Sequence, residues 1–229
     1  NQSLIDISNQ SITDRYLQPT MFTILPDKLF LSAVGAAEDR TLLEQHRITH
    51  ILNLTGPPPG STTPRHPNAF PDSFEYLHIC RRDDEATSID EYVDRGHTFI
   101  RSALSASPSE HRVLVHCEAG ISRSAITVLT YLVRFENMTL LEAYEYVKAI
   151  KPNIGPNSSF MQQAIDRERE WRPTLTAPSL NLIDYQVDQI QRGPLAGFPL
   201  SRERIADELR RQQGDIQRVQ NALLDEVLG

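Results

Sequence analysis

The chain has 229 residues, of which 39% are hydrophobic, and its formal net charge is −7. This length is sufficient for one sizeable hydrophobic core with room for appendages. The acidic balance argues against sequence-independent binding to nucleic acid, which requires a basic face. Two cysteines are too few for a disulfide framework, and no spacing of Cys and His is typical of a zinc site.

The sequence predicts neither a secreted protein nor a membrane-spanning one. The first ten residues, NQSLIDISNQ, lack the basic and apolar regions of a signal peptide. No apolar run reaches the roughly 18 residues that span a bilayer. We therefore expect a protein of a reducing compartment, cytoplasmic or nuclear, with no membrane span, no metal and no cofactor.

The first part of the chain predicts strands around a short helix. Residues 1–20 are polar and weakly periodic, which predicts an N-terminal extension. Alternating hydropathy over 24–34 predicts one or two short strands. Residues 36–46 predict a short helix, and the β-branched segment 48–55 predicts a buried strand. A stretch dense in Pro and Gly follows over 56–71, for which a disordered insertion and a polyproline ligand are both open.

The alternation of strands and helices continues. Strands are predicted over 74–80 and 111–116. Between them a helix is predicted to start at Ser88, which with Glu91 forms the Ser-x-x-Glu pattern of a capping box.

Three further helices are predicted after the strand 111–116. The helix from Arg123 to about Glu136 is apolar nearly all round, which indicates burial. Thr139 begins the next helix with a second capping-box pattern. A last helix is predicted to be capped by Asn157 or Ser158.

Strands separated by helices predict an α/β fold, with a central, mostly parallel sheet flanked by helices. This unit spans 21–172, and 173–229 reads as a linker and a helical C-terminal tail. Apolar residues approximate one helical stripe over 201–228, interrupted by Gly214. Two hypotheses remain for this stripe: a helix folded back on the domain, and a helix that binds a partner or self-associates.

The stretch VLVHCEAGISRS, residues 113–124, indicates an anion site. A buried strand ends at His116 and a helix begins near Arg123, so the loop between them lies where open α/β sheets bind ligands. Gly120 allows successive backbone N–H groups to converge on an anion. The guanidinium of Arg123 is suited to two oxygens of a phosphate.

Cys117 adds a nucleophile to this anion site. A thiol at a helix N-terminus beside a guanidinium is readily held as the reactive thiolate. The pattern therefore indicates attack on phosphorus, a phosphocysteine intermediate and its hydrolysis. Ser124 is placed to donate to the departing thiolate, and His116 to hold the loop. The alternative is a buried structural cysteine beside a solvated arginine, which the complete pattern disfavours.

Such a reaction needs an acid that protonates the leaving alcohol or phenol. The segment 78–88 is the only predicted strand-to-helix loop with adjacent carboxylates. Asp83 and Asp84 are the candidates, ahead of Glu85, and spacing alone does not choose between them. The alternative is that these carboxylates are solvated at a helix start.

The segment VHCEAGISRSAITVLTYL resembles the signature of the dual-specificity phosphatases, within the superfamily of cysteine-dependent protein tyrosine phosphatases. Further segments before and after it resemble the family in order, so the resemblance covers about 21–172. It is closest in character to the small, atypical members. The resemblance implies the protein tyrosine phosphatase fold for this part of the chain and places no family on 173–229.

By position, the resemblance implies that Cys117 is the nucleophile and Arg123 the phosphate clamp. It implies that Ser124 helps the thiolate leave and that Asn157 braces the phosphate loop. Asp83 becomes the general acid, with Asp84 as second choice. The cradle of backbone amides would be Glu118, Ala119, Gly120, Ile121 and Ser122.

The loop interior EAGIS carries an acid and no lysine. Relatives that act on phosphoinositides tend to have lysines there, and RNA 5′-triphosphatase relatives are more basic. We therefore expect phosphotyrosine and phosphoserine/threonine in phosphorylated signalling proteins as substrates. The alternatives are a non-protein phosphate ester (phospholipid, glucan or RNA 5′ end) and a phosphoprotein-binding scaffold without catalysis. Cys80 is either a resolving thiol for oxidised Cys117 or a small apolar residue that ends a strand.

Overall fold

The computed structural model describes residues 19–228, so the predicted N-terminal extension lies almost wholly outside the described residues. The chain forms two compact units. Among the described residues, the first contains 19–81 together with Thr98–Gly120, and the second contains Arg82–His97 and 121–228. The chain therefore passes from the first unit into the second within the loop that carries the phosphatase-like signature.

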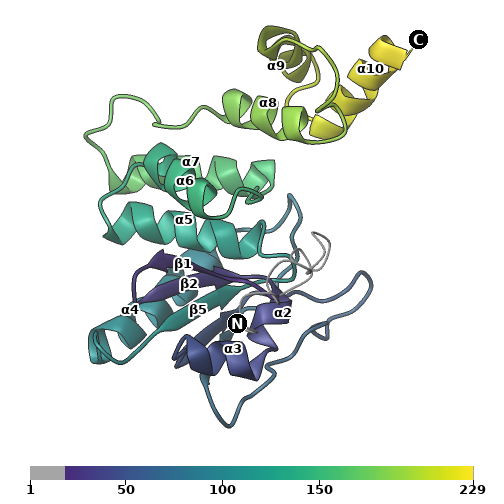
Figure 1. Ribbon diagram of the computed structural model, residues 1–229. Helices are drawn as coiled ribbons and strands as arrows, with labels where there is room; N and C mark the ends of the chain where they lie inside the picture. The colour runs from purple at the N-terminus through teal and green to yellow at the C-terminus, as the bar shows by residue number, and fades with distance from the viewer. Residues whose placement is uncertain (1–18, 229) are drawn as a thin grey trace, which may run out of the picture. The chain divides into compact units, whose positions relative to one another are not determined.

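The first unit is built on a five-stranded sheet in the order β1-β2-β5-β3-β4 (Figure 1). Its strands are β1 (Met21–Leu25), β2 (Leu29–Ser32), β3 (His50–Asn53), β4 (Glu75–His78) and β5 (Val113–His116). β1 is antiparallel to β2, and the other three pairs are parallel. The predicted mostly parallel sheet is confirmed. All four residues of β2, β3 and β5 are buried, as expected of parallel strands covered on both faces.

The segment predicted as one helix over 36–46 forms two, α2 (Val34–Ala37) and α3 (Arg40–Gln45). Asp39 causes the break, because its side chain accepts a hydrogen bond from the backbone N–H of Leu42 at 3.0 Å and so begins a new helix. Leu43 of α3 is fully buried in a core cluster that also contains residues of β2, β3 and β5.

The helix expected from Ser88 begins differently. The Ser88 hydroxyl accepts from the backbone N–H of Asp90 at 3.1 Å, two residues on rather than three. The chain then makes a π-helical turn, η1 (Tyr92–Gly96), and continues as α4 (His97–Ala106). In the second unit, the fully buried Tyr92 packs edge-on against Phe160, with ring centroids 5.9 Å apart. Packing of this kind against a distant helix cannot be read from a local capping pattern.

The second unit contains α5 (Arg123–Phe135), α6 (Leu140–Ile150) and α7 (Ser158–Trp171), which pack on one another (Figure 1). α5 is buried from Arg123 to Val133, as its uniformly apolar sequence predicts. The capping box of Thr139 and Glu142 is present at the start of α6. Asn157 rather than Ser158 caps α7, since its side chain accepts from the N–H of Phe160 at 2.9 Å.

The helical C-terminal extension is confirmed, but it has three helices: α8 (Leu182–Arg192), α9 (Arg202–Arg211) and α10 (Ile216–Leu228). Gly214, at φ +81°, separates α9 from α10, so the stripe over 201–228 is not a single helix. The three helices share one apolar core, made of Val187, Ile190, Leu195, Ile205, Ala206, Leu209, Val219 and Leu223. Among the described helices, none is long and apolar enough to cross a membrane.

Candidate active site

β5 is the central strand of the sheet, and its last residue is paired with a neighbouring strand on each side. His116 pairs with Ser32 of β2 and with Asn53 of β3. Its carbonyl also accepts from the N–H of Leu54 at 2.8 Å. Cys117 is the first residue beyond this ladder, and only 1% of its surface is exposed. The sheet therefore fixes the backbone from which the thiol projects.

Gly120 lies against the chain that leaves β2. Its φ is +69°, and a Cβ there would lie 2.7 Å from the carbonyl oxygen of Ser32 and 2.8 Å from the nitrogen of Ala33. Two residues earlier, the carbonyl of Glu118 accepts from the N–H of Val34 at 3.1 Å. Only glycine combines this backbone angle with so close an approach.

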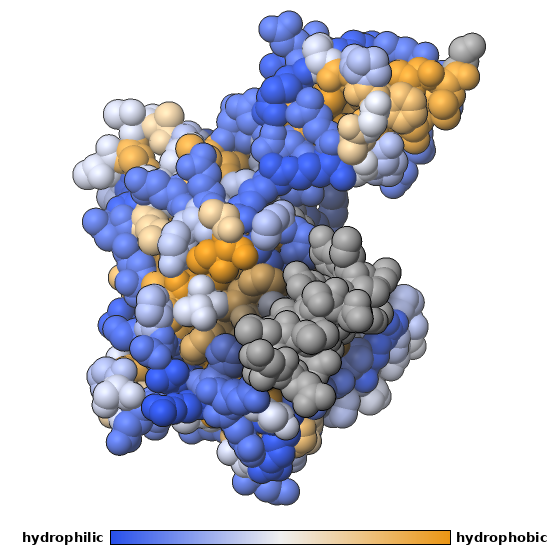
Figure 2. Space-filling view, viewed as in Figure 1, coloured by the Kyte–Doolittle hydropathy of each residue, from blue (hydrophilic) through white to orange (hydrophobic). Residues whose placement is uncertain are grey.

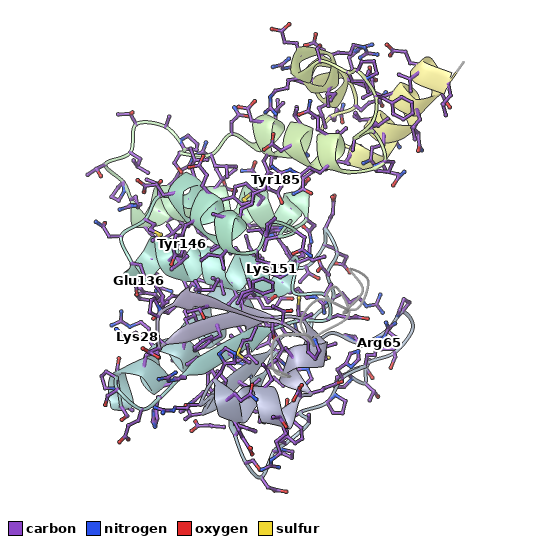
Figure 3. The ribbon with its side chains drawn as sticks, in the orientation of Figure 1. Lys28, Arg65, Glu136, Tyr146, Lys151 and Tyr185 are labelled. Carbon is purple, nitrogen blue, oxygen red and sulfur yellow. The ribbon has the colours of Figure 1, made fainter. Side chains whose placement is uncertain are left out.

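The Pro-rich stretch 56–71 folds back toward this loop rather than forming a disordered insertion. The backbone carbonyl of His66 accepts from the side chains of Asn53, at 3.1 Å, and Thr55, at 2.9 Å. Next to it, Arg65, which is labelled in Figure 3, pairs with the carboxylate of Glu118 at 2.6 Å. The acid predicted within the phosphate loop is thus paired with an arginine that sequence spacing did not single out.

In the second unit, Asp83 meets the start of α5. Its carboxylate accepts from the Ser122 hydroxyl at 2.7 Å and from Nε of Arg123 at 3.3 Å. The Arg123 side chain is 8% exposed and that of Asp83 is 26% exposed. A nearly buried guanidinium needs a partner of opposite charge, and Asp83 is such a partner.

Asn157 joins the same cluster from the start of α7. Its side-chain amide donates to the carboxylate of Asp83 at 2.9 Å, and its backbone N–H donates to the Ser122 hydroxyl at 3.2 Å. Two residues earlier, the N–H of Gly155 donates to the carbonyl of Ile121 at 3.0 Å. The segment before α7 therefore holds the backbone just before Arg123, while Asn157 also caps α7.

The two adjacent aspartates have different surroundings. Whereas Asp83 faces Ser122 and Arg123, Asp84 accepts from the Thr87 hydroxyl within its own turn at 2.8 Å. Glu85 is exposed, and its backbone carbonyl accepts from the Ser159 hydroxyl at 2.8 Å. Within this unit, Asp83 is the carboxylate that the fold brings to the start of α5.

The remaining predicted residues lie on or beside the same loop. Ser124 is fully buried in the first turn of α5, and His116 is buried at the end of β5. Ala119 is exposed and Ile121 is half-buried. Among residues 19–228, no group of three or more His, Cys, Asp or Glu could hold a metal ion.

Cys80 and Cys117 are separated by the order of the sheet. His78 of β4 and His116 of β5 both pair with Asn53 of the intervening strand β3. Two interstrand spacings amount to about 10 Å, whereas the Cα atoms of a disulfide lie at most about 7 Å apart. A Cys80–Cys117 disulfide would therefore require the backbone after β4 to move.

Besides Arg65, sequence reasoning missed Tyr185 as a neighbour of this site. The hydroxyl of Tyr185, on α8, donates to the backbone carbonyl of Pro156, directly before Asn157. No motif marks Tyr185, because its contact with Pro156 depends on how α8 packs on α7 rather than on local spacing.

Chemically, the start of α5 is suited to an oxyanion. Backbone N–H groups at a helix N-terminus attract anions, and the guanidinium of Arg123 lies in the first turn. The adjacent carboxylate of Asp83 is positioned to carry a proton to or from a group bound there.

Comparison with known proteins agrees with these features. Residues 29–170 match the family model described as the dual specificity phosphatase catalytic domain. Human dual specificity protein phosphatase 14 is 38% identical over 146 residues, which cover 64% of this chain and 68% of the relative. The crystal structure of the human tyrosine phosphatase-like serine/threonine/tyrosine-interacting protein aligns with a TM-score of 0.57 and 30% identity, covering 66% of this chain and 97% of that one. PTPMT1 in complex with PI(5)P aligns with a TM-score of 0.54 over 67% of this chain and 97% of its own, but at 18% identity it shares the fold alone.

Proposed function

Because the chain belongs to the family of dual-specificity phosphatase catalytic domains, we propose that it hydrolyses phosphotyrosine and phosphoserine/threonine esters of proteins through a phosphocysteine intermediate. The observation that carries this proposal is the single loop between β5 and α5. Cys117 follows the buried strand, and Arg123 begins the buried helix six residues later. Attack on phosphorus requires a nucleophile beside a group that binds phosphate, and this short loop supplies both in the Cys117 thiol and the Arg123 guanidinium.

In the proposed reaction, the thiolate of Cys117 attacks phosphorus and the bond from phosphorus to the substrate oxygen breaks. Asp83 gives its proton to that oxygen, so the product leaves as a neutral alcohol or phenol. Water then attacks the phosphocysteine and gives a proton to Asp83, while the hydroxyl of Ser124 donates to the departing thiolate. Arg123 and the backbone N–H groups of residues 118–122 bind the phosphoryl oxygens, over which the negative charge is spread in the transition state.

A protein substrate is favoured by the charge of the loop. Glu118 is paired with Arg65, and the loop EAGIS offers no lysine for a second phosphate. The likeness to a phosphoinositide complex is at the level of fold and supports no phosphoinositide substrate here. A non-protein phosphate ester remains the alternative substrate class, and a phosphoprotein-binding scaffold remains the alternative without catalysis.

Substitution of the thiol tests the proposal directly. Cys117→Ser should reduce the hydrolysis of p-nitrophenyl phosphate by at least about 10³-fold, because a serine hydroxyl is a far weaker nucleophile than a thiolate. Phosphate release from matched phosphotyrosyl and phosphothreonyl peptides, phosphoinositides and phosphoglucans then identifies the substrate class. Equal rates for wild type and Cys117→Ser would exclude the enzyme and leave the scaffold.

A further inference from the structure

The segment that carries Asn157 rests against α8, a helix outside the residues that match the family model. The hydroxyl of Tyr185 donates to the carbonyl of Pro156. One residue along α8, the amide of Gln186 donates to the hydroxyl of Ser158 at 3.2 Å. These two contacts bracket Asn157 on both sides along the chain.

Gln189 completes the contact from the next turn of α8. A Cβ added to Gly155 would lie 2.9 Å from its Nε2, so the backbone of the segment and this side chain are closely packed. Its side-chain oxygen Oε1 would lie 3.1 Å from the same Cβ, so the whole amide of Gln189 faces Gly155. The segment 155–158 therefore meets three side chains of α8, those of Tyr185, Gln186 and Gln189.

The Tyr185 side chain is buried and packed where it makes this contact. Only 3% of its surface is exposed, and its ring packs edge-on against Tyr144 of α6 with centroids 5.4 Å apart. Figure 3 shows Tyr185 between α8 and the helices α6 and α7. Burial raises the pKa of Tyr185 far above its usual value, and the nearby charge of Asp83 raises it further. The hydroxyl therefore stays protonated and remains a donor to Pro156.

The path from Tyr185 to the candidate acid is short. Tyr185 holds Pro156, and the next residue, Asn157, donates to the carboxylate of Asp83 at 2.9 Å. The same residue donates from its backbone to Ser122, which also donates to Asp83. A shift of the segment would thus move the Asn157 amide away from the carboxylate and weaken the contact of the segment with Ser122.

We propose that Tyr185 is a positioning residue for the phosphatase reaction, which holds Asn157 where its amide orients Asp83. Helix α8 then helps to position the acid, although it lies beyond residues 29–170, which match the family model. This inference rests on the proposed function, since it assigns a role to Asp83 as the acid. A displacement of about 1 Å at a catalytic group can cost up to about 10²-fold in rate.

A comparison of two substrates with different leaving groups distinguishes a misplaced acid from general damage to the enzyme. An acid matters most when the departing oxygen is strongly basic. Tyr185→Phe in the full chain should therefore lower kcat/KM about tenfold on phenyl phosphate, whose phenol is a poor leaving group, and within about twofold on p-nitrophenyl phosphate. Inhibition by inorganic phosphate should be unchanged, because its ligands on α5 are intact.

Tyr144→Phe is the matched control. Tyr144 is also buried and in ring contact with Tyr185, but its hydroxyl accepts from Nζ of Lys148 at 2.6 Å. Tyr144→Phe should leave the ratio of kcat/KM on phenyl phosphate to kcat/KM on p-nitrophenyl phosphate as in wild type. If Tyr185→Phe does not fold, as judged by circular dichroism, Gln189→Ala takes its place, and it should show the same selective loss at smaller size.

The outcomes distinguish this inference from the proposed function. If wild type releases phosphate no faster than Cys117→Ser, the proposed function fails and the role of Tyr185 with it. Two results with an active wild type would overturn the positioning role alone. In the first, the variant at Tyr185 or Gln189 loses kcat/KM equally on both esters. In the second, it behaves as Tyr144→Phe.

Discussion

At the residue scale, Asp83 and Asp84 are neighbours in the chain with different surroundings. Asp83 accepts hydrogen bonds from Ser122, Arg123 and Asn157, whereas Asp84 accepts from Thr87. The Asp84 carboxylate is thus hydrogen-bonded within its own turn, close to the start of the helix that follows. The position of Asp83 beside Arg123, the predicted phosphate clamp, favours it over Asp84 as the residue that exchanges a proton with substrate.

Exchange of each carboxyl for an amide measures this difference. Asp83→Asn removes the proton donor while keeping its size, so kcat/KM on phenyl phosphate should fall by about 10²-fold or more. Asp84→Asn is the matched control and should stay within about threefold, because the Asp84 carboxylate accepts its hydrogen bond from Thr87, within its own turn. Initial rates on phenyl phosphate give both values, and a larger loss for Asp84→Asn would move the acid one position along the chain.

At the element scale, His97 connects α4 to α5. Its Nε2 lies 3.1 Å from the carbonyl of Thr127 and 3.2 Å from the Thr130 hydroxyl. Rings of Tyr131 and Trp171 lie against it. Burial lowers the pKa of His97 to about 4, helped by the charge of Arg134 and opposed by the bond to Thr127. The imidazole is therefore neutral in the folded chain at neutral pH.

This burial predicts a loss of stability in mild acid. Between pH 6.5 and pH 4 the unfolded chain binds a proton at His97 that the folded chain excludes, so the free energy of unfolding falls as pH falls. The contribution of His97 is about 2 kcal/mol between pH 7 and pH 5. Urea unfolding at both values measures it.

The control is His97→Gln, which cannot titrate. Its stability should be lower at pH 7 because ring contacts are lost, yet its fall between pH 7 and pH 5 should be smaller by about 2 kcal/mol. An equal fall in the two proteins would assign the acid sensitivity to other groups.

At the scale of the whole molecule, the C-terminal helices have a core of their own. All eight buried members of that core lie between Val187 and Leu223, so none belongs to the region that matches the family model. Hydrophobic residues also reach the surface over α10 (Figure 2), where Leu228 is 73% exposed. We expect these helices to respond to core substitutions as a distinct cooperative element.

Leu209→Ala tests this expectation. Leu209 is 1% exposed in the middle of the core, so its truncation should destabilise the three helices by about 2–5 kcal/mol. Part of the helical circular-dichroism signal should be lost at a lower temperature than in wild type. Leu228→Ala, at the exposed end of α10, should change stability by at most about 0.5 kcal/mol. A single transition that shifts as a whole would show that the helices unfold with the rest of the chain.

Much of the local structure could be predicted from sequence because it depends on residues that are close in the chain. The capping box at Thr139, a helix cap at Asn157 or Ser158 and the buried α5 all follow from patterns within a few positions, and the structure selects Asn157 as the cap. Where the prediction was wrong, a single side chain or a tertiary contact changed the outcome. Asp39 divides the helix expected over 36–46 into two, and the Ser88 hydroxyl bonds the N–H of Asp90 instead of completing the expected capping box.

The sequence by itself determined the chemistry of the loop: a thiol after a buried strand, a glycine that permits a tight path, and an arginine at the start of a buried helix. Tertiary structure alone decided which groups surround the start of α5. Asp83 reaches Arg123 across 40 residues and Asn157 across 74, and Tyr185 reaches Pro156 across 29. Such distances in the chain carry no periodic signal, because these contacts arise only when helices pack on one another.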